Sequence, residues 1–88
     1  MFTCNKKRFL ERKVENKYIF FDLESGEGHL LDEVGTAIFD AVTKHDTERA
    51  TEELLEVFEG VEREELRHDI EIFVKDLTEK GVIYESDS

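Results

Sequence analysis

The chain has 88 residues, of which 12 are Lys or Arg and 23 are Asp or Glu, so its formal net charge is −11. This length predicts one small domain with a thin core, and the acidic balance argues against binding to a nucleic-acid phosphate backbone. No apolar run approaches the roughly 20 residues of a membrane-spanning helix, and no apolar segment follows the basic residues at 6–8 as in a secretory signal. We therefore expect a cytoplasmic protein with no membrane partner.

The charge is unevenly distributed along the chain. Residues 1–17 hold six basic and two acidic residues, whereas residues 18–88 hold six basic and 21 acidic ones. We predict that residues 1–8 form a flexible basic N-terminus, 9–84 the folded domain and 85–88 an acidic tail. The basic segment either lies on the acidic body and neutralises part of its charge or forms a docking surface for an acidic partner.

Three short strands are expected before the first helix. Residues 9–14 form a weak first strand, Tyr18–Leu23 is rich in aromatic and β-branched residues, and Gly28–Leu31 returns after a turn in which Gly26 can adopt positive φ. Strand alternation makes both faces of the second strand largely apolar. One face carries Ile19, Phe21 and Leu23, and the other carries Tyr18, Phe20 and Asp22.

Three amphipathic helices are expected to follow the strands. Asp32 can cap the first, Thr51 can cap a short second helix that ends at Gly60, and the third runs from about Glu62 to Lys80. Their apolar stripes are Val34, Ala37, Ile38, Ala41 and Val42, then Leu54, Leu55 and Phe58, then Leu66, Ile70, Phe73, Val74 and Leu77, with an apolar extension at residues 82–84.

This order of elements predicts an α+β fold, in which a three-stranded antiparallel sheet is followed by three helices that pack on one face. Three helices beside a small hairpin also describe a winged helix-turn-helix domain. No internal repeat or low-complexity segment divides the chain.

The sequence contains no arrangement typical of a catalytic, metal or cofactor site. His29, His45 and His68 are not paired at helical spacing, and no glycine-rich phosphate-binding motif occurs. Cys4 is the single cysteine, so no intramolecular disulfide and no cysteine-based zinc cage can form. Cys4 is either incidental or a reactive thiol beside basic residues.

The order and spacing of several short motifs resemble the PqqD-like family, whose namesake is the peptide chaperone of pyrroloquinoline quinone biosynthesis. The resemblance covers roughly residues 9–84. It departs from the family pattern at Asp32, where Asn is usual, and in lacking a proline-rich entry. The motifs that carry it are Tyr18-Ile19-Phe20-Phe21-Asp22-Leu23-Glu24-Ser25-Gly26, His29-Leu30-Leu31-Asp32-Glu33, Ala37-Ile38-Phe39, Thr51-Glu52-Glu53-Leu54, Asp69-Ile70, Phe73, Leu77 and Lys80-Gly81-Val82-Ile83.

The resemblance implies a non-catalytic recognition element for ribosomally synthesised, modified peptides. In such domains the leader of a precursor peptide adds as a strand to the third strand and packs against the third helix. The domain then presents the precursor to a modifying enzyme, often a radical S-adenosylmethionine (SAM) enzyme. The residues expected to contact the leader are Gly28, His29, Leu30 and Leu31 on the strand, and Arg67, Ile70, Glu71 and Val74 on the helix.

Other interpretations remain open at this point. Arg67 either contacts an acidic leader side chain or pairs with Glu71 within the helix. The chain could instead be a winged-helix interaction or regulatory domain that binds a folded protein and ignores extended peptides. An exposed strand edge and the Tyr18–Phe20 face of the second strand could also pair two copies in a homodimer.

Overall fold

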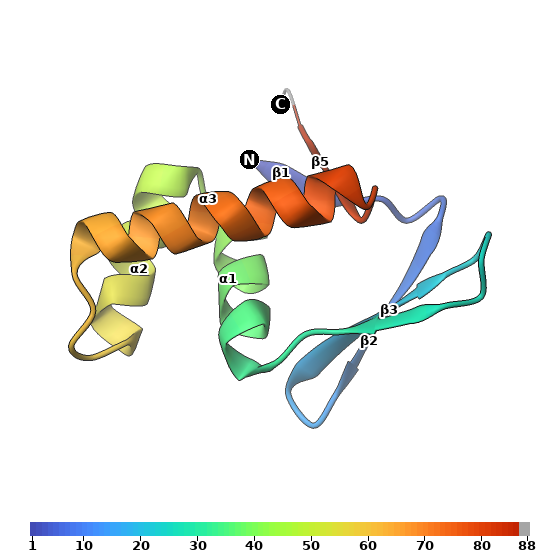
Figure 1. The fold of residues 1–88 in the computed structure, drawn as a ribbon, viewed down its shortest axis with the longest axis horizontal. Helices are drawn as coiled ribbons and strands as arrows, with labels where there is room; N and C mark the ends of the chain where they lie inside the picture. Colours follow the sequence, from blue (N-terminus) through green and yellow to red (C-terminus); the bar gives the residue numbers. More distant parts are fainter. Residues whose placement is uncertain (87–88) are drawn as a thin grey trace.

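The computed structural model describes residues 1–86, which form two small antiparallel sheets and three helices (Figure 1). The larger sheet has the strand order β2-β3-β4, and the smaller sheet pairs β1 with β5. The fold is the predicted α+β, winged-helix-like arrangement. The elements are β1 (Phe2–Cys4), β2 (Phe9–Val14), β3 (Lys17–Asp22), β4 (Gly28–Leu30), α1 (Glu33–Lys44), α2 (Thr47–Val57), α3 (Arg63–Glu79) and β5 (Ile83–Glu85).

Two turns set the register of the larger sheet. Glu15 and Asn16 both have positive φ between β2 and β3, as a two-residue type I′ hairpin requires. Gly26, with φ 79°, serves the β3–β4 turn, where the backbone N–H of Gly26 donates to the carbonyl of Asp22 at 2.7 Å. The resulting register pairs Ile19 with Leu30 across β3 and β4.

Capping and turn residues mark where the helices begin and end. Asp32 caps α1 as predicted, because its carboxylate accepts the backbone N–H of Gly35 at 2.7 Å. Helix α3 runs from Arg63 to Glu79, close to the predicted range. It ends where Gly81, with φ 80°, turns the chain toward β5.

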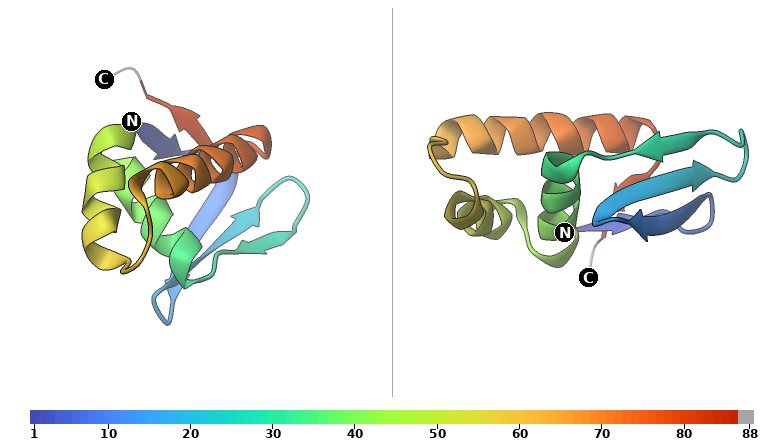
Figure 2. Two further views of the ribbon diagram at one scale, coloured as in Figure 1. Left: turned by 60° about the vertical axis from the view of Figure 1, so that its left-hand side comes forward. Right: turned by 90° about the horizontal axis from the view of Figure 1, so that it is seen from below.

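The long helix α3 connects two hydrophobic clusters. Its first half supplies Leu66 and Ile70 to a cluster with α1 and α2, and its second half supplies Leu77 to a cluster with Phe20 and Phe39. Figure 2 shows this arrangement, with the helices gathered at one end of the molecule, the β2–β3–β4 sheet at the other and α3 reaching from one to the other.

The prediction of a loose N-terminus was wrong. Residues 2–4 form β1, which pairs with β5, and Cys4 is buried opposite Ile83. The pairing joins the two ends of the chain and extends the folded unit to Glu85. Local composition could not indicate it, because each strand is only three residues long and its partner lies about 80 positions away. Of the predicted acidic tail, residues 87–88 lie outside the described residues.

The predicted start of the second helix was also wrong. Asp46 is its cap, since its side chain accepts the backbone N–H of Arg49 at 2.9 Å. Thr51 is instead buried in the middle of α2, where its hydroxyl donates to the carbonyl of Thr47 at 2.7 Å. A threonine that bonds back to the preceding turn satisfies its hydroxyl without ending the helix.

The two faces of β3 have different surroundings. Phe20 is fully buried and packs edge-on against Phe39, with ring centroids 5.0 Å apart, and Tyr18 packs against the same ring. This face is therefore closed by α1 and cannot pair two copies. The other surface predicted for a homodimer, the exposed strand edge, stays a prediction. The opposite face stays open, with Phe21 38% and Leu23 62% exposed.

Candidate functional site

Strand β4 forms an open edge of the larger sheet. Only β3 pairs with β4 among residues 1–86. An unpaired edge presents backbone N–H and C=O groups that can bond to a further strand.

Alternation of hydrogen bonds identifies which backbone groups of β4 point to the open edge. The N–H of Leu31 donates to the carbonyl of Tyr18 at 2.9 Å, and the N–H of Asp22 donates to the carbonyl of Glu27 at 2.8 Å. In an antiparallel pair every second residue bonds to the partner strand, so the intervening residues Gly28 and Leu30 turn their backbone groups outward. Two residues of β4 can thus bond to an incoming strand.

A groove runs between this edge, the start of α1 and one side of α3. Its volume is about 540 Å³. The exposed side chains that border it include Leu30, Val34 and Ile72, which are 67%, 52% and 55% exposed. Three apolar side chains from three different elements therefore face solvent around one hollow beside the open edge.

Gly35 allows α1 to approach α3 closely at the floor of the groove. A Cβ at this position would lie 3.3 Å from the ring of Phe73 and 3.2 Å from the carboxylate of Asp32. Both contacts are tighter than ordinary van der Waals distances. The glycine thus sets the depth of the groove by permitting the start of α1 to pack against Phe73.

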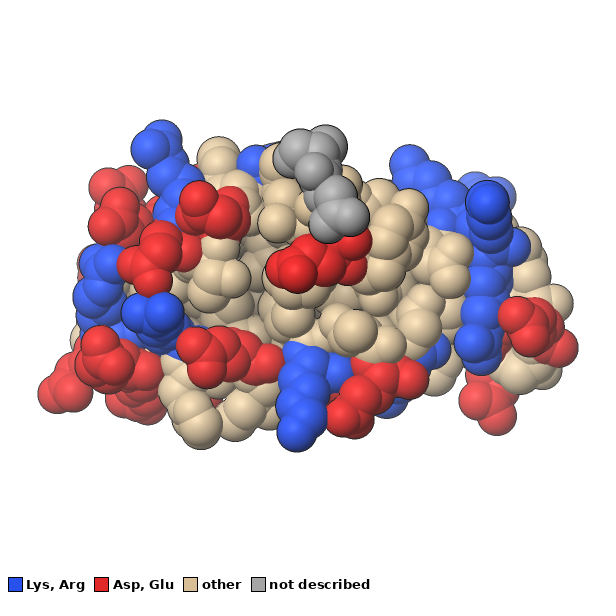
Figure 3. All heavy atoms as spheres, turned by 90° about the horizontal axis from the view of Figure 1, so that it is seen from above, with Lys and Arg blue, Asp and Glu red and all other residues tan. Residues whose placement is uncertain are grey.

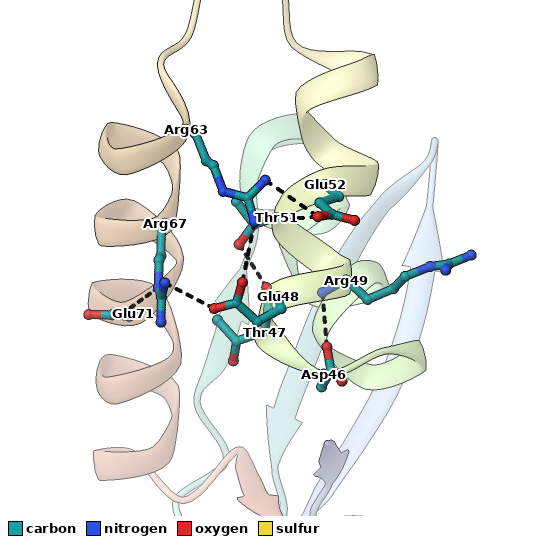
Figure 4. Close-up of polar contacts among 9 residues, drawn as sticks. All are labelled: Asp46, Thr47, Glu48, Arg49, Thr51, Glu52, Arg63, Arg67 and Glu71. Carbon is teal, nitrogen blue, oxygen red and sulfur yellow. Dashed lines mark hydrogen bonds and ion pairs between the residues drawn. The ribbon is translucent and has the colours of Figure 1, made fainter.

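The helical residues predicted from sequence lie elsewhere. Ile70 is fully buried in the core, and Val74 packs against both clusters. Arg67 is 2.9 Å from Glu48 of α2 and 3.4 Å from Glu71, and Figure 4 shows its guanidinium directed toward α2. Arg67 and Glu71 therefore do not line this groove, and their contact with a leader stays a prediction.

Helix geometry gives the physical reason. The residues of α3 that line the groove are Asp69, Ile72, Phe73 and Asp76. At about 100° per residue, positions two apart, such as Arg67 and Asp69, lie about 160° apart around the helix. The sequence did contain a signal, because Ile72 is an apolar residue outside the predicted stripe.

The four predicted strand residues do lie together at the open edge, with different roles. Gly28 and Leu30 offer their backbone groups. His29 turns toward the inner face, where its ring lies 6.2 Å from that of Phe9. Leu31 is half-buried against the core, so His29 and Leu31 anchor β4 to the sheet.

An ion pair holds the turn that leads into β4. Arg8 donates from Nη2 to the buried carboxylate of Asp22 at 3.0 Å. The carboxylate also accepts the backbone N–H of Glu24 at 2.9 Å. The hydrogen bond from Arg8, followed by the backbone bonds, lowers the pKa of Asp22 well below its usual range.

Within residues 1–86, the cysteine and the metal-ligating side chains do not form a second site. Burial and the nearby carboxylate of Glu11 raise the pKa of Cys4 to about 11, which lowers the fraction of reactive thiolate at neutral pH. No group of three metal-ligating side chains occurs within residues 1–86. In the same part of the chain, no helix combines the length and hydrophobicity needed to cross a bilayer.

Two solved structures share this fold. One, described as "Lasso peptide synthetase B1 complexed with the leader peptide", has a TM-score of 0.83 and 22% identity, and the match covers 96% of this chain and 98% of that chain. The other, "TbiB1 in Complex with the TbiA(beta) Leader Peptide", has a TM-score of 0.77 and 17% identity, and the match covers 91% and 93%. No curated protein sequence matches the chain.

A family model provides the sequence-level match. The model described as "Coenzyme PQQ synthesis protein D (PqqD)" matches residues 17–83. This range extends from the start of β3 into β5, and so includes β4, all three helices and the groove between them. The chain therefore belongs to the PqqD family.

Proposed function

We propose that this protein is a non-catalytic peptide chaperone that binds the leader of a ribosomally synthesised precursor peptide. The observation that carries the proposal is the open edge of β4, where Gly28 and Leu30 direct backbone groups outward beside an apolar groove. The two solved structures with this fold are described as leader-peptide complexes, which supports a leader peptide as the ligand.

In this mechanism the leader adds as a fourth strand to the β2–β3–β4 sheet. Main-chain hydrogen bonds to Gly28 and Leu30 set its register, while alternate side chains enter the groove and supply specificity. We assign the groove contacts to Leu30, Ile72 and Phe73. A leader that is disordered before binding loses conformational entropy when it binds, which offsets part of the interaction free energy. A few well-packed anchor side chains therefore determine its affinity.

The predicted residues on the other sides of α3 support the site indirectly. Ile70 and Val74 seat the helix on the core, and Arg67 and Glu71 join it to α2. We therefore assign them a positioning role.

The bound precursor is then presented to a separate modifying enzyme. A radical SAM enzyme is one class that suits this role. In this proposal the chain supplies binding and orientation, and the enzyme supplies the chemistry.

Leu30→Pro tests strand addition directly. The N–H of Leu30 points away from β3, so proline removes an outward donor and leaves the β3–β4 ladder intact, as is typical of edge strands. The probes are 12-residue peptides selected on the full chain from a random display library. We expect L30P to weaken their binding about tenfold or more, and L30A, which keeps the N–H, to weaken it much less.

Fluorescence anisotropy measures both affinities, and circular dichroism confirms that each variant remains folded. On the wild-type protein, bound peptides should shift the amide resonances of residues 28–31 and 69–76. Selected peptides that bind L30P as tightly as L30A would contradict strand addition at this edge.

A further inference from the structure

The groove beside β4 carries charge of one sign only. Its ionisable lining residues are Asp32, Asp69 and Asp76, and no Lys or Arg lines it. The adjoining hollow between the start of α1, the end of α2 and α3 shares Asp69 and adds two further carboxylates, Glu59 and Glu65, again without a basic residue. The ionisable side chains that line the two hollows are therefore all acidic.

These carboxylates are not equally engaged within the protein. Asp32 caps α1, and Asp76 pairs with Lys80 at 3.0 Å on an exposed turn. The side chain of Asp69 has no ion pair or hydrogen bond with any of residues 1–86 and is exposed. Its charge, at the point where the two hollows meet, is therefore uncompensated within the described structure.

The other side of α3 is different. Arg63 contacts Glu48 and Glu52, and Arg67 contacts Glu48 and Glu71, so both arginines of α3 are engaged with carboxylates at the α2 seam. Figures 3 and 4 show the result, with acidic and basic side chains interleaved at the end formed by α2 and the start of α3. Both arginines of α3 are thus held away from the groove, where Lys80 pairs with Asp76 and leaves Asp69 without a basic neighbour.

We propose that the groove selects a peptide segment in which Lys or Arg residues flank apolar anchors. This inference rests on the proposed function and specifies the chemistry of its ligand. Complementary charge favours such a segment at the interface and disfavours an acidic one. The net charge of −11 also attracts a basic segment from solution.

The spacing of the groove residues defines the pattern. Asp69 and Asp76 are two helical turns apart, about 10.5 Å along the axis, with Ile72 and Phe73 between them. Side chains on one face of a strand at positions i and i+4 are about 13 Å apart, and flexible basic side chains can span the difference. Figures 1 and 2 show that α3 and β4 both run roughly along the long axis. The expected pattern on the groove-facing side is basic, apolar, basic at i, i+2 and i+4.

The peptides selected from the random 12-residue library test this pattern. We expect the enriched sequences to carry Lys or Arg around alternating apolar residues. Replacing those basic residues by Glu should weaken binding about tenfold. Raising the NaCl concentration from 50 to about 300 mM should weaken the binding of the basic peptide but not of its Glu-substituted version. On the protein side, Asp69→Asn should weaken binding about threefold.

The matched control is Glu64→Gln, which removes one negative charge from α3 outside the groove. It should leave peptide affinity unchanged. Selected peptides that need the N–H of Leu30 but show no basic enrichment, or that respond equally to D69N and E64Q, would overturn this inference and leave the proposed function intact. Selected peptides that do not distinguish L30P from L30A, or no selection at all, would overturn both.

Discussion

At the scale of single residues, Asp22 controls how the chain enters β4. Its carboxylate is buried, accepts bonds from Arg8 and from the backbone of Glu24, and sits at the start of the β3–β4 turn. A buried carboxylate is tolerable because a cation and backbone donors satisfy it. The same contacts that lower its pKa fix the position of the open edge.

Asp22→Asn should destabilise the protein in a pH-dependent way. Because the folded-state pKa of Asp22 is lowered, its contribution is present above its unfolded pKa of about 4 and is lost as pH falls through the folded value. Urea denaturation should show the wild type more stable than D22N at pH 7. The gap should narrow progressively below pH 4.

Glu24→Gln is the control for that measurement, since Glu24 is exposed and contacts Arg8 only at 3.5 Å. It should change stability little at any pH. A stability gap between wild type and D22N that stays constant from pH 7 to pH 2.5 would show that the charge on Asp22 is not the stabilising feature.

At the scale of elements, α3 serves three different neighbours around its circumference. One side packs into the core through Ile70, a second joins α2 through Arg67, and a third borders the groove through Ile72. The core-facing stripe was readable from the sequence because apolar residues recur at helical spacing. The groove and the α2 seam were harder to read, because both combine charged with other residues and depend on where other elements pack.

The pair Ile70→Ala and Ile72→Ala separates two of these roles. Ile70 is fully buried, so its truncation should lower the free energy of unfolding by about 2–5 kcal/mol. Ile72 is 55% exposed, so its truncation should cost under about 1 kcal/mol and still weaken binding of the selected peptides several-fold.

Urea denaturation and peptide anisotropy on both variants provide the measurements. If I72A destabilised the protein as much as I70A and left peptide affinity unchanged, Ile72 would belong to the core instead of the groove.

At the scale of the whole molecule, the β1–β5 pair closes the chain on itself. Phe2 packs against both hydrophobic clusters, and Cys4 lies buried against β5. The predicted domain, residues 9–84, omits β1 and therefore omits the pairing of β1 with β5. The pairing of β1 with β5 holds Phe2 in contact with both clusters. It therefore couples the two halves of a thin core.

Phe2→Ala should weaken this closure and expose the thiol of Cys4. We expect a loss of about 2 kcal/mol in the free energy of unfolding and labelling of Cys4 by a disulfide reagent at pH 8 at least about tenfold faster than in wild type. The wild-type thiol should react slowly, because burial holds its pKa at about 11.

Tyr84→Ala is the matched control in the same small sheet, because Tyr84 is 52% exposed. It should change the labelling rate by less than about threefold. Equal acceleration in F2A and Y84A would indicate that β1 is held by β5 alone and not by its contacts with the clusters.

The sequence by itself determined the order of the three main strands and three helices, the Asp32 cap, the winged-helix-like class and the position of β4. Turn residues, caps and apolar periodicity act over a few positions, so the printed sequence contains them. The tertiary structure alone decided that residues 2–4 pair with 83–85, that α1 covers Tyr18 and Phe20, and that Asp69 and Ile72 rather than Arg67 and Glu71 border the groove. Those three outcomes depend on which elements meet in space. Each requires many contacts between residues far apart in the sequence to form together.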